Sequence, residues 1–264
     1  VSLTMSLFTI NTSVADVYRE PDFNSTMVTQ ALLGESCEVL NQHENWVLIR
    51  QWDGYEGWVN HFLGVHSEEP YMSSHVCYSL STPYLDEPDG EILRKICFSC
   101  SLKGDSTENG YRVILPDGMN AWTNTELYSD PDPATRENIL QSAFRFLGTP
   151  YQWGGKTPGG MDCSGFVQTV FKSAGVNLPR DAPQQEEFLK NAQVELEEAG
   201  WGDLLFFSEN GRVTHVAICT GEMGFINARG WVRKESLEEN AQNFNKKLKS
   251  LFSLAVSMKD LLIA

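Results

Sequence analysis

Several features that would assign a protein class at once are missing from this chain of 264 residues. It has no run of about 18 apolar residues, so we expect no helix that spans a bilayer. Basic residues are scarce, because 20 Lys and Arg stand against 35 Asp and Glu, which gives a formal charge of −15. A nucleic-acid or anionic-membrane partner is therefore disfavoured, since either would need a basic face.

The sequence shows no recognisable pattern of a disulfide framework or of a signal peptide. The six cysteines are spread along the chain without the compact spacing of a disulfide-rich domain, which favours the reducing cytoplasm. Residues 1–10 lack a positively charged start and do not resemble a signal peptide, although a chain whose signal had been removed would look the same. We therefore expect a cytoplasmic protein, with a periplasmic or secreted location as the alternative.

Two of the cysteines, Cys97 and Cys100, have the CxxC spacing found in many zinc sites. A tetrahedral zinc site needs a second pair of ligands, and only His75 and Cys77 lie nearby, at an unconvincing spacing. We therefore favour two interpretations without zinc, a disulfide or a pair of ordinary strand cysteines.

What the chain does contain is a cysteine at the expected start of a helix. Residues 157–160, Thr-Pro-Gly-Gly, cannot continue a helix, whereas from Phe166 apolar residues recur at helical spacing until Gly175. This pattern predicts Cys163 in the first helical turn. Unpaired N–H groups and partial positive charge at such a position stabilise a thiolate, and lower the cysteine pKa from ~8.5 to roughly 3.5–7.5. The alternative is an ordinary buried cysteine.

Three strands are predicted downstream as an antiparallel meander, over residues 202–207, 213–220 and 224–228. His215 lies near the start of the middle strand. If the third strand pairs with the second, Asn227 comes close to His215 on the same face, because alternate residues of a strand share a face. Its side-chain oxygen could then accept the Nδ1 proton of the imidazole. With the helical cysteine, these two residues form a candidate set of nucleophile, base and orienter.

The first half of the chain has a different character. Short segments rich in Val, Leu, Thr and Trp alternate with turn dipeptides such as Asp53-Gly54, a pattern typical of small antiparallel barrels. The segment Ser129–Pro133 is then predicted to be a linker. We expect Asp132 to cap the helix that follows and Pro133 to lie in its first turn.

Five motifs in the second half occur in an order that resembles the NlpC/P60 cysteine peptidases of bacteria. They lie at residues 148–155, 162–166, 178–181, 202–207 and 214–218. The resemblance covers the chain from about residue 134 to its end. It implies that Cys163 is the nucleophile, His215 the general base and Asn227 the third polar residue. Many members of the family carry a second histidine at that last position, so Asn227 is a departure from the common pattern.

The first half is similar to bacterial SH3 domains over residues 15–65. Residues 71–128 resemble a second, more divergent copy, in which Asp117–Trp122 takes the place of Asp53–Trp58. The expected fold class is α+β, with a papain-like NlpC/P60 catalytic domain preceded by two small SH3-like β-barrels. The predicted domain limits are 1–68, 69–129 and 130–264.

The subgroup that this three-domain layout resembles cleaves cell-wall peptides after γ-D-glutamate and releases L-Ala-γ-D-Glu from a diamino acid. Such a substrate carries a free carboxylate and a free amine, and each charge needs a counter-group in a partly dry cleft. By this resemblance, Asp162 and Ser164 would hold the glutamyl part, with Trp153 as an apolar wall. Arg180 would pair with a carboxylate or with Asp181.

The free amine of such a substrate should meet an acid or an aromatic ring. The resemblance implies that the first SH3 barrel closes the far end of the cleft, and that Glu20 and Tyr55 lie in the segments matching the contact positions. The enzyme would then measure the peptide from its free end.

The mechanism that these residues imply is acyl transfer through a thioester, without a metal or a cofactor. The expected partner is a small murein peptide, and the protein is expected to be a monomer. Two alternatives stay open. One is an inactive protein that binds wall peptides, and the other is an amidase or acyltransferase on the same scaffold. Diaminopimelate and lysine both stay open as the leaving residue.

Overall fold

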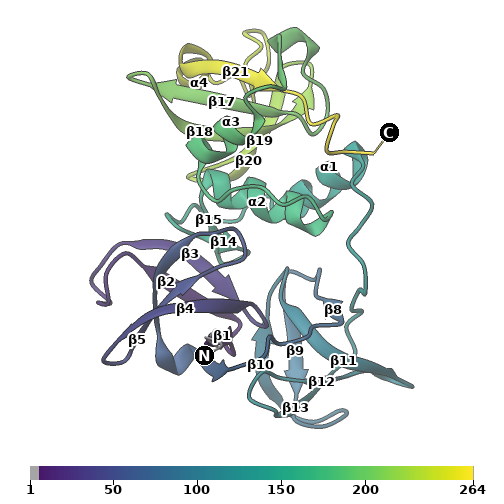
Figure 1. Ribbon diagram of the computed structural model, residues 1–264. Helices are drawn as coiled ribbons and strands as arrows, with labels where there is room; N and C mark the ends of the chain where they lie inside the picture. Colours follow the sequence, from purple (N-terminus) through teal and green to yellow (C-terminus); the bar gives the residue numbers. More distant parts are fainter. Residues whose placement is uncertain (1–5, 264) are drawn as a thin grey trace. The chain divides into compact units, whose positions relative to one another are not determined.

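A computed structural model describes residues 6–263 of the chain. The chain divides into two compact units, Val1–Pro131 and Asp132–Ala264, whose helices and strands are labelled in Figure 1. The boundary falls inside the segment that the sequence predicts as a linker. Residues 1–5, part of the predicted first domain and of the stretch compared with a signal peptide, lie outside the described residues, as does residue 264.

The N-terminal unit begins with a seven-stranded antiparallel sheet. Its elements are β1 (Leu7–Ile10), β2 (Val14–Tyr18), β3 (Met27–Leu32), β4 (Ser36–His43), β5 (Trp46–Arg50), β6 (Glu56–Asn60), the 3₁₀ turn η1 (His61–Leu63) and β7 (Gly64–Ser67). The strand order is β3-β2-β6-β5-β4-β1-β7. Alternate side chains point inward, as Ala15 and Val17 of β2 show, and they build one apolar core with Phe8, Val47 and Val59.

A second antiparallel sheet, of six strands, follows in the same unit. Its elements are β8 (His75–Val76), β9 (Thr82–Leu85), β10 (Ile92–Ile96), β11 (Ser101–Thr107), β12 (Gly110–Ile114) and β13 (Asn120–Thr123). The strand order is β10-β9-β13-β12-β11-β8. Leu32, the last residue of β3, and the adjoining Leu33 are buried in the core of the second sheet with Tyr84 and Val113. The two sheets therefore share apolar packing.

Two turns show the same hydrogen bonds in both sheets, at the positions where the sequence predicts a repeat. The N–H of Tyr55 donates to Asp53 Oδ1 over 3.0 Å, and the N–H of Met119 donates to Asp117 Oδ1 over 2.9 Å. A glycine with positive φ follows each aspartate, Gly54 at 80° and Gly118 at 85°. Such an Asp-Gly turn fixes the strand pairing on either side, because glycine adopts the left-handed conformation at no steric cost.

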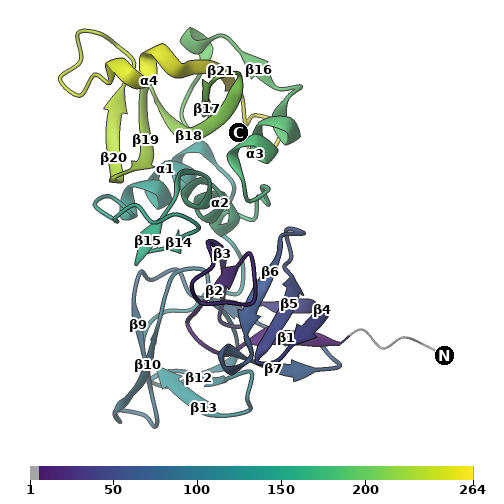
Figure 2. The ribbon, with the colours of Figure 1, turned by 90° about the vertical axis from the view of Figure 1, so that its left-hand side faces the viewer.

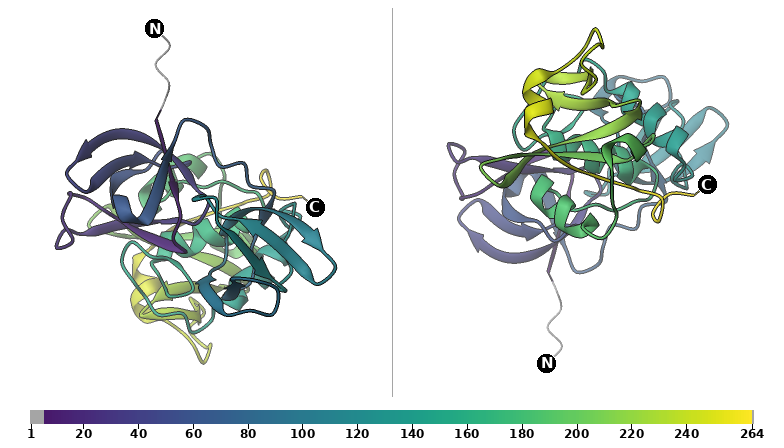
Figure 3. Two further views of the ribbon diagram at one scale, coloured as in Figure 1. Left: turned by 90° about the horizontal axis from the view of Figure 1, so that it is seen from below. Right: turned by 90° about the horizontal axis from the view of Figure 1, so that it is seen from above.

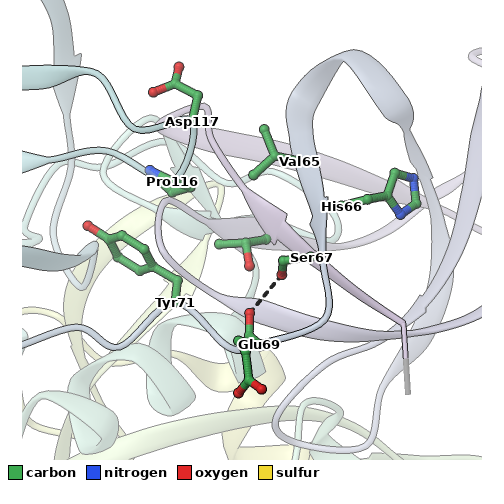
Figure 4. Close-up of a pocket in the computed structure, with 8 residues that line it drawn as sticks. Val65, His66, Ser67, Glu69, Tyr71, Pro116 and Asp117 are labelled. Carbon is green, nitrogen blue, oxygen red and sulfur yellow. Dashed lines mark hydrogen bonds between the residues drawn. The ribbon is translucent and has the colours of Figure 1, made fainter. Parts of the chain in front are cut away.

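A hollow between the two sheets of the N-terminal unit is drawn in Figure 4. Tyr71 lies in its wall, and its hydroxyl donates to the Ile114 carbonyl over 2.7 Å. The hydroxyl of Ser67 donates to the Glu69 carbonyl over 2.8 Å. None of the residues predicted to form the active site lines this hollow.

The C-terminal unit packs helices against one antiparallel sheet. Its elements are α1 (Arg136–Arg145), β14 (Lys156–Thr157), β15 (Gly160–Met161), α2 (Cys163–Ser173), α3 (Ala182–Leu189), β16 (Gln193–Val194), the 3₁₀ turn η2 (Leu196–Glu198), β17 (Leu204–Glu209), β18 (Arg212–Gly221), β19 (Gly224–Arg229), β20 (Trp231–Ser236), α4 (Lys246–Leu251) and β21 (Phe252–Val256). The sheet order is β16-β21-β17-β18-β19-β20. Within the described residues, no helix is long and apolar enough to cross a bilayer.

The predicted meander is confirmed. Strand β18 pairs antiparallel with β17 and with β19, the latter through Ile218↔Ile226. Within this unit, α2 and α4 lie on opposite sides of the sheet (Figures 1 and 2), and Figure 3 gives two further views of the ribbon. The face carrying Ala217 and Cys219 packs against Leu248 of α4. The His215 ring lies 5.5 Å from the ring of Phe207, a residue of the same cluster.

The predicted start of α1 is wrong by about one turn. The helix begins at Arg136, and Thr135 is its N-cap, with a hydroxyl that accepts the N–H of Asn138 over 3.2 Å. The N–H of Asp132 instead donates to the Ser173 carbonyl over 3.2 Å. Two residues with capping ability lie close together here, and only tertiary contacts decide which one caps the helix.

Candidate active site

Cys163 is the first residue of α2, as the sequence predicts. The helix starts there because Asp162 is its N-cap, with a carboxylate oxygen that accepts the N–H of Gly165 over 2.7 Å. The short hairpin of β14 and β15 occupies the chain immediately before, so the helix has no room to begin earlier. The cysteine side chain is 8% exposed. It therefore lies at a helix N-terminus, but in a largely buried site.

Asp162 is held by a dense set of internal contacts. Arg180, only 1% exposed, donates to both of its oxygens, through Nη1 over 2.9 Å and through Nη2 over 2.7 Å. The N–H of Gly154 donates to Oδ2 over 2.9 Å. Arg180 Nη1 also donates to Ser164 Oγ over 3.1 Å. The structure thus brings together three predicted substrate-binding residues, and it joins them to one another around the start of α2.

We expect Arg180→Ala to destabilise the C-terminal unit by about 3–5 kcal/mol, because it leaves the Asp162 carboxylate buried without its cation. Urea unfolding of the full chain, followed by a probe in this unit, measures the loss. The control is Lys190→Ala, which removes an exposed ion pair with Glu187 and should cost about 0.2–1 kcal/mol. Equal losses in the two variants would show that the buried pair does not stabilise the site.

His215 and Asn227 are in direct contact. The imidazole Nε2 lies 2.8 Å from Asn227 Oδ1, whereas the sequence argument assigned this contact to Nδ1. The amide of Asn227 is fully buried, and its Nδ2 donates to Glu235 Oε2 over 2.9 Å, so Oδ1 must face the ring. An oxygen can only accept, so Nε2 carries the proton and Nδ1 keeps its lone pair. Asn227 therefore orients the ring with Nδ1 as the basic nitrogen.

Glu235 is a site residue that the sequence argument missed. Its Oε1 accepts from Asn245 Nδ2 over 2.7 Å and from Arg233 over 3.1 Å, so the carboxylate is held on both sides. It lies on β20, where Arg233 is paired with Asn227 and Glu235 is two residues further on the same face. The sequence does show an acidic residue in the strand after the one that carries Asn227. Its contact with Asn227 could be predicted only from the pairing of β19 with β20, which the sequence does not give.

Cys163 lies against β18 at the position of the candidate base. Its sulfur takes hydrogen bonds from the backbone N–H groups of Val216 and Ser164, and Val216 directly follows His215. Among residues 6–263, no hydrogen bond joins the sulfur to the imidazole. Catalytic hydrogen bonds are often long in ligand-free enzymes and shorten when substrate binds. The nucleophile and the base thus come from neighbouring elements, with Nδ1 available.

The resting ionisation differs from the sequence expectation. Burial raises the pKa of the Cys163 thiol to about 11, and the charge of Asp162 adds to the rise. The two N–H donors and Arg180 oppose this rise without cancelling it. Burial also lowers the pKa of His215 to about 4, against the effect of its bond to Asn227. Burial therefore acts against the low-pKa thiolate that the sequence predicts, and it favours a neutral thiol and a neutral imidazole in the free protein.

This ionisation predicts how alkylation depends on pH. Because the pKa of Cys163 is about 11, the thiolate fraction rises about tenfold for each pH unit between pH 6 and 9. We expect the rate of iodoacetamide labelling at Cys163, measured by peptide mass spectrometry, to rise in the same way. A rate that is constant above pH 5 would instead show a thiolate–imidazolium pair in the free protein. Labelling of the partly buried Cys97 provides an internal reference.

Tyr151 also lies near the nucleophile, and the sequence argument did not select it as a site residue. Burial raises the pKa of its hydroxyl to about 12, and the charges of Cys163 and Asp162 contribute. Trp153, the predicted apolar wall, is 63% exposed and is open to a ligand.

The predicted amine contacts lie in the N-terminal unit. Glu20 is in the turn after β2, and Tyr55 is in the turn before β6. The β2–β6 pair Tyr18↔Trp58 brings these two turns to the same edge of the sheet. Their part in binding stays a prediction.

The structure also shows the state of the two cysteines with CxxC spacing. Cys97 and Cys100 are free thiols whose sulfur atoms lie 3.8 Å apart, so the disulfide interpretation is wrong for this structure. Within residues 6–263, no group of three or more His, Cys, Asp or Glu side chains is arranged to hold a metal ion.

Comparison with known proteins agrees with this architecture. A profile of the NlpC/P60 family matches residues 148–249, and one described as the bacterial dipeptidyl-peptidase SH3 domain matches residues 17–61. The crystal structure of an NlpC/P60 family protein from Bacillus cereus superposes with a TM-score of 0.81 at 24% identity, over 95% of this chain and 99% of that chain. This likeness establishes the α+β, papain-like fold with SH3-like β-rich structure before it.

Two curated relatives extend the comparison. A γ-D-glutamyl-L-lysine dipeptidyl-peptidase of Bacillus cereus is 30% identical over 226 residues, which are 76% of this chain and 66% of the relative. A protein of the same name from Bacillus subtilis is 31% identical over 212 residues, 75% of this chain and 71% of the relative. The chain thus spans about two thirds of the length of these relatives. It belongs to the NlpC/P60 family of peptidases and carries a bacterial SH3 domain ahead of its peptidase domain.

Proposed function

We propose that this peptidase acts on peptidoglycan peptides and hydrolyses the bond between γ-D-glutamate and a diamino acid, releasing L-Ala-γ-D-Glu. The observation that carries the proposal is the ordered contact between His215 and Asn227 beside the helix-start cysteine Cys163. The names of two relatives, γ-D-glutamyl-L-lysine dipeptidyl-peptidases, support this choice of bond. The intact nucleophile and base argue against an inactive binding protein.

In the proposed reaction, Nδ1 of His215 takes the thiol proton as Cys163 Sγ bonds to the γ-carbonyl carbon. The carbonyl electrons move to oxygen, and the backbone N–H of Cys163, at the start of α2, stabilises the oxyanion. The C–N bond then breaks, and the imidazolium returns its proton to the leaving amine. A water molecule, deprotonated by Nδ1, attacks the thioester, releases the dipeptide and restores the thiol.

The contacts of Asp162 give it and Arg180 a positioning part in this proposal. Both side chains are buried and bonded to each other, so they fix the start of α2 and the adjoining Ser164. We keep Ser164 and Trp153 as proposed contacts of the glutamyl part. The cytoplasmic location remains a prediction of the sequence.

A single experiment tests the function. The protein is incubated with L-Ala-γ-D-Glu-meso-diaminopimelate and with the lysine peptide, and products are identified by mass spectrometry. We expect L-Ala-γ-D-Glu and a free diamino acid. Transfer of the dipeptide to an added amine in preference to water would indicate an acyltransferase. Binding without cleavage would indicate a wall-peptide receptor.

Recognition of the free amine is tested separately at Glu20, which we propose as its counter-charge. Glu20→Gln should raise KM for a peptide with a free N-terminal amine by about tenfold, and should change KM little for the N-acetylated peptide. The matched control is Glu44→Gln, an exposed acid on another turn of the same unit. An equal effect on free and blocked peptides would defeat the idea that the enzyme reads the amine.

A further inference from the structure

A cavity of about 310 Å³ lies in the C-terminal unit, with His215 in its wall. Tyr151 contributes to it from the loop before β14, and Arg229 from the end of β19. Lys247 and two leucines, Leu248 and Leu251, line it from α4. Its volume is at the lower end of the range for small-molecule sites, enough for about one amino-acid residue.

The charge of this cavity is opposite to that of the protein. The chain has 35 acidic and 20 basic residues, yet the lining contains Arg229 and Lys247 and no Asp or Glu. Lys247 is partly engaged, because its Nζ lies 2.9 Å from Glu209 Oε1. The Arg229 side chain has no ion pair or hydrogen bond within residues 6–263. A guanidinium with its donors free is suited to bind a carboxylate through two parallel hydrogen bonds.

The position of Arg229 follows from the strand. Asn227 and Arg229 are two residues apart on β19 and therefore share a face, and Asn227 contacts the imidazole on that face. The charge of Arg229 reaches the ring, since it contributes to the lowered pKa of His215. Arg229 is thus close to the base, and both residues line the same cavity.

The proton transfer in the proposed reaction relates this cavity to the leaving side of the scissile bond. The imidazolium must hand its proton to the leaving amine, so the leaving amine approaches His215. The groups attached to that amine extend past the ring, into space that the ring itself lines. The cavity has that ring in its wall, and its two leucines offer an apolar surface to a methylene chain.

We propose that Arg229, assisted by Lys247, binds a carboxylate of the diamino acid that leaves, and so selects peptides with a negative charge on the released residue. This proposal rests on the proposed function and names the substrate class more narrowly. The carboxylate has two sources. It is the α-carboxylate of a terminal lysine or diaminopimelate, or the side-chain carboxylate that diaminopimelate has and lysine lacks. The side-chain ammonium of a substrate lysine in the same cavity would be repelled by the positive charges of Arg229 and Lys247.

Three peptides separate these sources. The first is L-Ala-γ-D-Glu-L-Lys with a free α-carboxylate, and the second is its α-amide. The third is L-Ala-γ-D-Glu-meso-diaminopimelate in which the α-carboxyl of the diaminopimelate is amidated, so that this residue keeps only its side-chain carboxylate. The full chain is compared with Arg229→Gln, Arg229→Lys and Lys247→Gln. The matched control is Arg212→Gln, an exposed arginine at the start of β18 that does not line the cavity.

We expect Arg229→Gln to lower kcat/KM by about tenfold to a hundredfold for peptides whose leaving residue carries the recognised carboxylate. For the α-amide of the lysine peptide, Arg229→Gln should change kcat/KM by less than about threefold. Arg229→Lys should recover part of the loss in kcat/KM, and Lys247→Gln should lower kcat/KM less than Arg229→Gln does. A loss with the first peptide assigns the α-carboxylate, and a loss with the third assigns the side chain. Equal losses with and without carboxylates, or no loss at all, overturn the proposal.

A binding measurement distinguishes failure of this inference from failure of the proposed function. The same peptides are titrated calorimetrically into Cys163→Ala, with and without Arg229→Gln. If the wild-type protein does not cut at γ-D-glutamate, the proposed function is wrong. Carboxylate-dependent binding that requires Arg229 would still support the cavity, and binding independent of Arg229 would overturn it.

Discussion

Cys163→Ala should reduce turnover of γ-D-glutamyl peptides to the uncatalysed level, a loss of more than about 10⁵-fold. Only this cysteine lies at the start of α2, and without its sulfur no thioester can form. The change removes one buried atom and leaves the cap of the helix on Asp162, so folding and peptide binding should persist. Product formation by mass spectrometry, together with thermal unfolding, measures both quantities.

A matched cysteine provides the control for this loss. Cys97→Ala removes the partly exposed thiol of the N-terminal unit and should leave turnover and its inhibition by iodoacetamide unchanged. Chelators should leave wild-type activity unchanged, since the proposed steps use only a thiol and an imidazole. Hydrolysis that persists in Cys163→Ala would mean that another group is the nucleophile.

His215→Ala should lower kcat/KM by about 10³–10⁴-fold at pH 7, within the usual range for loss of a general base. The reason is quantitative. With a Cys163 pKa of about 11, only about one molecule in 10⁴ carries a thiolate at pH 7, so the reaction depends on a base that removes the proton. The residual rate of the variant should rise about tenfold for each pH unit up to about pH 10, as hydroxide replaces the base.

The wild-type pH profile and a second variant sharpen this test. The pKa of His215 is about 4, and the imidazole must be neutral to accept a proton, so wild-type kcat/KM should fall only below about pH 4–5. His66→Ala, in the N-terminal unit, is the control and should behave as wild type. A His215→Ala variant whose loss is the same at every pH would indicate that His215 has a role other than that of the base.

Much of the candidate site follows from local patterns. The helix start at Cys163 is readable because glycines and a proline exclude helix before it and an apolar stripe demands helix after it. The contact between His215 and Asn227 follows from the two-residue period of strands joined by a tight turn. The start of α1 was not readable, because both Asp132 and Thr135 can cap a helix.

Other features depend on residues far apart in the chain. Arg180 joins Asp162 across 18 positions, and Glu235 fixes Asn227 from a neighbouring strand. No local pattern announces these bonds, since an arginine or a glutamate is most often a surface residue. The ring nitrogen that faces Asn227 was misassigned because it depends on how the imidazole is turned in the folded site, whereas Glu235 sets only the orientation of the amide.

The amino-acid sequence by itself determined the order of elements, the family motifs, the nucleophile and base candidates, and the acidic character of the chain. These are properties of short windows, where hydrophobic period and turn chemistry suffice. Tertiary structure alone decided the ionisation of Cys163, the tautomer of His215 and the cationic cavity at Arg229. Each of these depends on burial and on charges brought close from distant positions, and electrostatic energies change steeply with distance and solvent access.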